Sequence, residues 1–176
     1  MAGEPEQAGV AAGGGDVNRG VHPPVGHHLA QLNVATMLEP LESPLMADFV
    51  ANLGRINSLA DSSPGFVWRL EDDDGAATTI RPFGDHILVN ISVWESIEAL
   101  HAFAFRTAHA EIMRRRRQWF RKMEQAYAVL WWVPVGHVPS TAEAAQRLAL
   151  LQEQGPTANA FTFQSVFPPP APGGKA

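Results

Sequence analysis

Two histidines and one arginine recur along a single helical face in the segment that follows Ser96. A turn of 100° per residue places His101, His109 and Arg116 in one stripe. The other members of the stripe are Phe105, Ile112, Met113, Trp119, Phe120 and Met123. A histidine titrates near neutrality and suits general-base catalysis, while a guanidinium suits a developing anion. The pattern predicts His109 as base or orienting group and Arg116 as the partner of a carboxylate or phenolate.

Both side chains also have a structural interpretation. His109 fits a core histidine with a hydrogen-bonded ring, and Arg116 fits an ion pair with Asp or Glu. His101 and His109 lie two turns apart, too far for the i, i+4 pair of a zinc helix, and cysteine is absent. We therefore expect no metal site.

Alternating residues in two predicted strands supply polar groups for a pocket. In His86–Trp94, the alternate residues Ile87 to Val93 form an apolar face. Asn90, Ser92 and Trp94 lie on the opposite face, which could line a pocket or be half-exposed. In the strand 29–36, Asn33 and Gln31 share the polar side, and the strand 65–71 adds Trp68.

The remaining elements complete an α+β pattern. Ser43-Pro44 predicts the start of a helix that continues to about residue 62. The region 96–122 predicts a long helix, broken near Thr107, and a strand follows at 127–135. Ser140 and Glu143 have capping-box spacing for a helix through Leu151, and 76–81 and 161–163 suggest short strands.

This order predicts a ferredoxin-like βαββαβ antiparallel sheet with helices on one face. We expect a homodimer, because the opposite apolar face needs a cover. The composition predicts a disordered tail at 1–27, one domain at 28–167 and a disordered Pro/Gly-rich tail at 168–176.

The overall charge of −5 argues against nucleic-acid binding, although seven of 13 basic residues lie between Arg106 and Lys122. That basic run is typical of a solvated helix face. The run Asp72-Asp73-Asp74 is typical of a solvated turn. No apolar run is long enough for a membrane span and no secretory signal is visible. With no cysteine, the chain fits a cytoplasmic protein.

Several segments together resemble the family called DUF3291, within the antibiotic-biosynthesis-monooxygenase-like superfamily of dimeric α+β barrels. They are LAQLNVA, SPLMADFV, INSLADSSPGFVWRL, ILVNISVWES, THA before RRRRQWF, LWWVPVGHVP and GPTANAFTF, across about residues 28–164. The superfamily includes cofactor-independent monooxygenases of polyketide phenols, cyclases, dehydratases and heme-degrading enzymes. The resemblance implies a ligand between helix and sheet within each subunit.

A looser resemblance leads to the heme-degrading branch. Trp94-Glu95-Ser96 matches the end of its strand before the heme-binding helix, and Asn33 could match its first-strand asparagine. Phe103 stands where that branch has tryptophan. His109 falls about one turn short of the expected ligand, where Met113 stands, so heme degradation fits poorly.

The sequence thus predicts a small-molecule biosynthetic enzyme acting on a hydrophobic, aromatic substrate by oxidation, cyclisation or dehydration, without a tightly bound organic cofactor. The catalytic candidates are His109, Arg116 and Asn90. The substrate-binding candidates are Asn33, Ser92, Trp94, Trp68, His101, Phe105, Met113 and Phe120. The alternatives are a heme-binding protein with His109 as axial ligand, and a non-catalytic binding or structural dimer.

Overall fold

The structure is a computed structural model that describes residues 26–171. These residues are organised around a single antiparallel sheet. The strands are β1 (His27–Thr36), β2 (Phe66–Arg69), β3 (Ile87–Trp94) and β4 (Ala128–Pro134). They lie in the order β2-β3-β1-β4, with every neighbouring pair antiparallel. The chain order confirms the predicted ferredoxin-like α+β fold.

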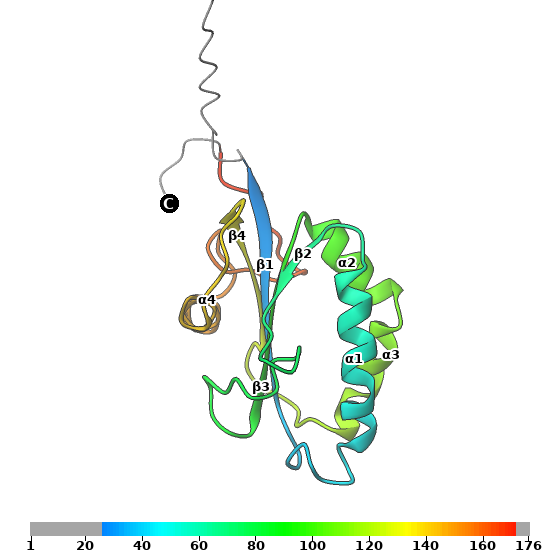
Figure 1. Cartoon of the computed structure of the whole chain (residues 1–176). Coiled ribbons are helices and arrows are strands. Elements are labelled where there is room, and N and C mark those ends of the chain that lie inside the picture. Colours follow the sequence, from blue (N-terminus) through cyan, green and yellow to red (C-terminus); the bar gives the residue numbers. More distant parts are fainter. Residues whose placement is uncertain (1–25, 172–176) are drawn as a thin grey trace, which may run out of the picture.

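Helices lie on both sides of this sheet (Figure 1). On one side lie α1 (Ala47–Asp61), α2 (Ile97–Arg106) and α3 (His109–Arg115), which ends in a 3₁₀ turn, Arg116–Gln118. On the other side lies α4 (Thr141–Gln154). None of the described helices is long and apolar enough to cross a membrane.

The sheet face toward α4 is apolar, as the strand alternation predicts. Val89, Ile91 and Val93 are at most 4% exposed, and Trp131 is fully buried. Leu148 and Leu151 of α4 belong to the same cluster. The expectation that these strand residues need a partner subunit is therefore wrong, because α4 and the segment after β2 already bury them.

Three local predictions are corrected. Residues 43–46 form turns instead of a first helical turn, so α1 begins at Ala47, and buried Met46 precedes it. The segment 76–81 consists of bends and irregular backbone. Residues 161–163 contribute only isolated bridges, from Phe161 to Leu130, with two backbone hydrogen bonds of 2.8 Å, and from Thr162 to Ser165. The predicted cap at α4 is confirmed, since Ser140 Oγ accepts from the Glu143 amide at 3.1 Å.

The predicted domain limits shift slightly at the N-terminus. His27, assigned to the tail by its composition, starts β1 and pairs with Pro134. At the other end, 168–171 is exposed and irregular. Residues 1–25 and 172–176, which hold the rest of the two predicted tails, lie outside the described residues.

The predicted helix break at Thr107 is confirmed, because two separate helices, α2 and α3, lie on either side of it. The Thr107 hydroxyl donates to the Phe103 carbonyl at 2.6 Å and accepts from the His109 amide at 3.2 Å. The Thr107 backbone is extended, with ψ of −177°. Because a threonine side chain competes for backbone partners in this way, α2 and α3 follow separate axes.

Candidate functional site

Four polar side chains cross the middle of the sheet face that α1, α2 and α3 cover. They form two rungs of directly paired residues, Gln31 with Ser92 and Asn33 with Asn90, and are called the polar belt below. Apolar side chains lie on either side of the belt. The upper cluster contains Leu29, Ala60, Trp94, Leu100, Leu130 and Phe161. The lower cluster contains Met37, Met46, Trp119 and Phe120.

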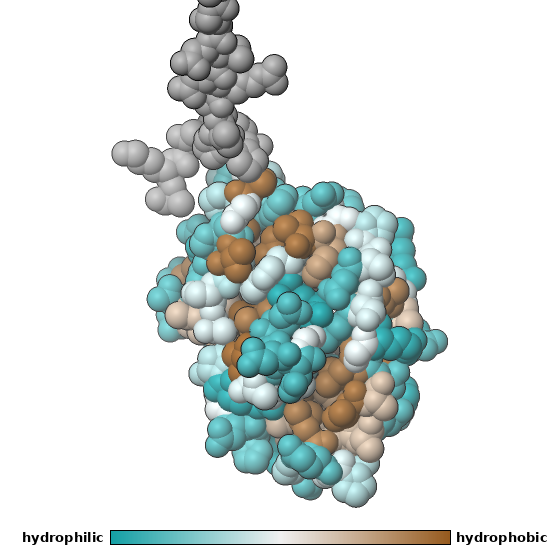
Figure 2. Space-filling view, viewed as in Figure 1, coloured by the Kyte–Doolittle hydropathy of each residue, from teal (hydrophilic) through white to brown (hydrophobic). Residues whose placement is uncertain are grey.

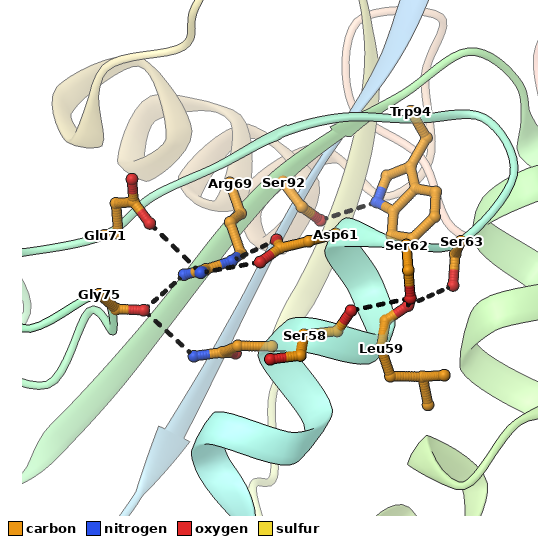
Figure 3. A network of polar contacts seen from close by, with 11 residues as sticks. Ser58, Leu59, Asp61, Ser62, Ser63, Arg69, Glu71, Gly75, Ser92 and Trp94 are labelled. Atoms are coloured by element: carbon orange, nitrogen blue, oxygen red, sulfur yellow. Dashed lines mark hydrogen bonds and ion pairs between the residues drawn. The ribbon is translucent and has the colours of Figure 1, made fainter.

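The upper rung is internally hydrogen-bonded. Trp94 Nε1 donates to Ser92 Oγ at 2.9 Å, and Ser92 Oγ donates to Gln31 Oε1 at 2.9 Å (Figure 3 shows the first bond). Ser92 and Gln31 are 6% and 8% exposed. This chain fixes the Trp94 indole, so Ser92 has a positioning role at the edge of the belt.

The lower rung differs, because its amides have no partner in the described part of the chain. No side-chain hydrogen bond joins Asn33 or Asn90 to another described residue, although both lie inside paired strands. Both residues are half-buried, and neither amide contains a fully buried unpaired atom. Because neither amide has an atom that is both buried and unpaired, water can satisfy them, and both remain free to hydrogen-bond a ligand.

His109 lies above the belt as the first residue of α3. Its ring packs on Phe103 with centroids 4.8 Å apart, and Phe103 stacks on Trp94 at 5.1 Å. Ile112, one turn further along α3, packs on the lower cluster. His109 therefore lies between the two clusters, at the level of the belt.

The hydrogen bonding of His109 defines its chemistry. Nδ1 lies 3.2 Å from the Ala104 carbonyl, which only accepts, so Nδ1 carries a proton. Burial lowers the pKa of His109 below its usual 6.5, although the bond to Ala104 acts in the opposite direction. At neutral pH the ring is thus uncharged and Nε2 has a free lone pair, as a general base requires.

Helix α1 supplies the other covering residue. Phe49 packs on the lower cluster and Ala60 belongs to the upper one. Ile56 shares their helical face and lies between them, half-buried. The site thus has amides on the sheet side and an apolar side chain and an imidazole on the helix side.

Arg116 does not form the predicted ion pair with an acid among the described residues. Its guanidinium lies over the Tyr127 ring, 4.2 Å from the centroid. No ion pair joins it to an acid among the described residues, whereas neighbouring Arg115 pairs with Asp48. A cation over an aromatic ring accounts for its half-buried position. The structure provides no support for Arg116 as an anion-binding residue of the belt.

The predicted single stripe is wrong, because the break at Thr107 separates its members. His101 and Phe105 contact Phe163 in an exposed aromatic group, with Phe105 54% exposed. Met113 is 37% exposed, and Phe120 belongs to the lower cluster. Trp68 packs on the α4 side of the sheet, away from His109.

Asn33, Asn90, Ser92 and Trp94 are therefore the predicted residues that share one sheet face, and His109 is the predicted helix residue that lies over it, through Phe103 and Trp94. Sequence reasoning placed Gln31 on the polar side of its strand without naming it as a site residue, and it missed Ile56. Gln31 had a signal, because it alternates with Asn33 along β1. Ile56 had none beyond helical spacing.

A heme site of the resembled type does not fit these residues. Met113 stands at the expected ligand position and points partly to solvent. His109 has the bonding pattern of an axial ligand, with Nδ1–H on the Ala104 carbonyl and Nε2 free, so the mismatch is one of position, about one turn short of the expected ligand. Nor do three or more metal-binding side chains gather anywhere within 26–171.

The fold is that of an antiparallel α+β protein with a row of polar side chains between the sheet and α1, α2 and α3. The chain belongs to the family described as "Domain of unknown function (DUF3291)", which it matches over residues 28–174. That family name assigns no activity. None of the curated proteins matches the chain.

Solved structures with some likeness share little sequence with this chain. SnoaB, a cofactor-independent oxygenase from Streptomyces nogalater, is 18% identical with a TM-score of 0.43, covering 65% of this chain and 100% of SnoaB. A protein of unknown function from Nitrosomonas europaea is 14% identical with a TM-score of 0.42, covering 65% of this chain and 94% of its own.

Proposed function

We propose that the protein is an enzyme that binds a hydrophobic, aromatic small molecule between its sheet and helices and removes a proton from it. The unpaired amides of Asn33 and Asn90 carry this proposal. Their carboxamides both donate and accept, so they match carbonyl and hydroxyl groups of one ligand. The apolar clusters on either side match its ring surfaces.

His109 is the proposed general base. Its Nε2 lone pair is available at neutral pH, because burial lowers the pKa and Nδ1 is bound to Ala104. Proton removal from a phenol or an activated C–H group would leave an anion, which the Asn33 and Asn90 amides could stabilise. Oxidation, cyclisation and dehydration of polyketide-like molecules share such a first step and need no tightly bound organic cofactor for it.

Native mass spectrometry of freshly purified protein tests binding. We expect a retained small molecule that Asn33→Leu and Asn90→Leu lose, because leucine keeps the volume but not the hydrogen bonds. Asn159→Leu, at an exposed position outside the sheet, is the matched control and should keep it. Equal retention by all three variants, or an empty wild-type protein, contradicts the proposal.

The same measurement tests the base. His109→Gln should retain a molecule whose mass differs from the wild-type one, because substrate accumulates where product otherwise remains. Melting temperatures accompany each variant to show that it is folded. If His109→Gln and the wild type retain a molecule of the same mass, the protein binds that molecule but His109 does not catalyse its conversion.

A further inference from the structure

A groove lies between α1 and the turn that follows β2. It has a volume of about 420 Å³, within the usual range of ligand pockets. Val50, Leu53, Gly54 and Asn57 line its α1 side, and residues from 74–78 line the other. Figure 2, seen from this side, shows apolar surface beside hydrophilic side chains.

Gly54 is an anomaly in this wall. A glycine inside a helix costs roughly 0.5–1 kcal/mol relative to alanine. Such a residue usually relieves a close contact, yet a Cβ built at Gly54 meets nothing within 4 Å in the described structure. Its effect is to leave the α1 backbone open to the groove, where a flat molecule can lie against it.

The groove adjoins the polar belt through Arg69. Arg69 pairs with Ser92 across β2 and β3, which extends the upper rung of the belt by one residue. Its Nη1 donates to the Gly75 carbonyl at 2.8 Å, and Gly75 lines the groove (Figure 3). Asn57 Nδ2 donates to the same carbonyl at 3.5 Å, so sheet, turn and α1 meet here.

The lower rung is open toward this groove. β2 ends at Arg69, so Asn90, one rung below Ser92, has no strand partner on its β2 side. The turn beyond β2 leaves the sheet at this point. The groove lining itself contains no belt residue, so a molecule that reaches Asn90 has to pass inward from the groove, beyond Gly75 and Arg69.

The charges around the groove disfavour anions. Among the described residues, its lining contains Glu42 and Asp74 and no lysine or arginine. The Arg69 guanidinium is already paired, with Asp61 at 2.7 Å and Glu71 at 3.2 Å. The belt side chains are uncharged amides and a hydroxyl, so a ligand that arrives already charged would lack a counter-ion there, whereas an anion formed by proton transfer would have the protonated His109 beside it.

We propose that the groove beside Gly54 is the mouth of the interlayer site, and that it admits flat, uncharged aromatic molecules bearing a carbonyl or hydroxyl group while excluding carboxylates. This inference rests on the proposed function of the belt. The inference adds the route by which a ligand enters the belt and the chemical class of that ligand.

Calorimetric titration with 2-naphthamide and 2-naphthoate tests the proposal, because the two probes differ chiefly in charge. At pH 7.5 we expect the wild type to bind the amide at least roughly tenfold more tightly. Gly54→Phe should weaken amide binding at least roughly tenfold by filling the mouth. Ala51→Phe, which puts the same ring on an exposed α1 residue outside the groove lining, is the matched control and should keep the affinity within roughly twofold.

The outcomes separate the two proposals. Amide binding that survives Gly54→Phe but not Asn90→Leu contradicts the groove as the entrance and is consistent with the belt as the binding site. Binding that survives Asn90→Leu but not Gly54→Phe shows a groove unconnected to the belt. Binding that survives both contradicts the proposed function itself. Equal affinity for the two probes, or no binding of 2-naphthamide by the wild type, overturns the ligand class.

Discussion

Trp131 Nε1 donates a hydrogen bond to Glu143 Oε1 at 2.9 Å, which joins β4 to the first turn of α4. The other carboxylate oxygen lies 2.7 Å from His137 Nε2. Trp131 is fully buried, so its N–H has no alternative acceptor in water. This pair helps to hold α4 on the sheet face that would otherwise be open.

Glu143→Ala should therefore destabilise the protein by about 1–3 kcal/mol, the usual result of leaving a buried donor unpaired. Glu143→Gln keeps an acceptor for Trp131 and should cost less. Urea unfolding at pH 7 measures both values. Equal stability of the alanine variant and the wild type would show that α4 does not depend on this bond.

The same carboxylate makes stability depend on pH. Burial opposes ionisation of Glu143, but the bonds from His137 and Trp131 outweigh it, and its pKa lies below the usual 4.5. A lowered pKa stabilises the fold above pH 4.5, and that contribution is lost as the pH falls through the folded-state pKa. The difference in melting temperature between wild type and Glu143→Gln should shrink on acidification below pH 4.5.

Asp72 should anchor the turn that forms the outer wall of the groove. Hydrogen bonds from the Thr79 amide and hydroxyl lower the pKa of Asp72 to about 2. The anchor should persist at pH 4 and weaken as the pH falls toward 2. Asp72→Ala should speed hydrogen exchange of the Thr79 amide, whereas Asp73→Ala, at an exposed neighbour, should not.

His109 should be a neutral Nδ1–H tautomer at pH 7. Because burial lowers its pKa, its contribution to stability is present above pH 6.5 and is lost as the pH falls through the folded-state value. Nitrogen chemical shifts of the ring, followed from pH 8 to 4, measure both tautomer and pKa. A midpoint at or above 6.5 would contradict the lowered pKa that burial of the ring predicts.

A homodimer remains a prediction. Trp68, Ile80 and Phe83 are half-buried at the margin of the α4-side cluster and could extend an apolar interface. Light scattering at micromolar concentration should give twice the monomer mass, and a stable monomer would refute the dimer. With α4 on the sheet, a monomer would no longer conflict with the fold.

The strand faces were predictable because a strand alternates with a period of two, whatever covers it. Asn33, Asn90, Ser92 and Trp94 were therefore assigned to the correct face from sequence. The helical stripe failed because it was continued across Thr107, where a break was itself predicted, and the helical period does not give the direction in which the chain resumes after a break. The position of Arg116 depends on Tyr127, and such tertiary contacts leave no local pattern.

The bridge between Phe161 and Leu130 has a consequence for self-association. It occupies backbone groups at the outer side of β4, while β2, at the opposite edge, has only four residues and an irregular register. Exposed edges pair with other chains when they are long and regular. The bridge shortens the free edge at one end of the sheet and β2 is too short to offer one at the other, so both limit fibril-like growth by strand addition.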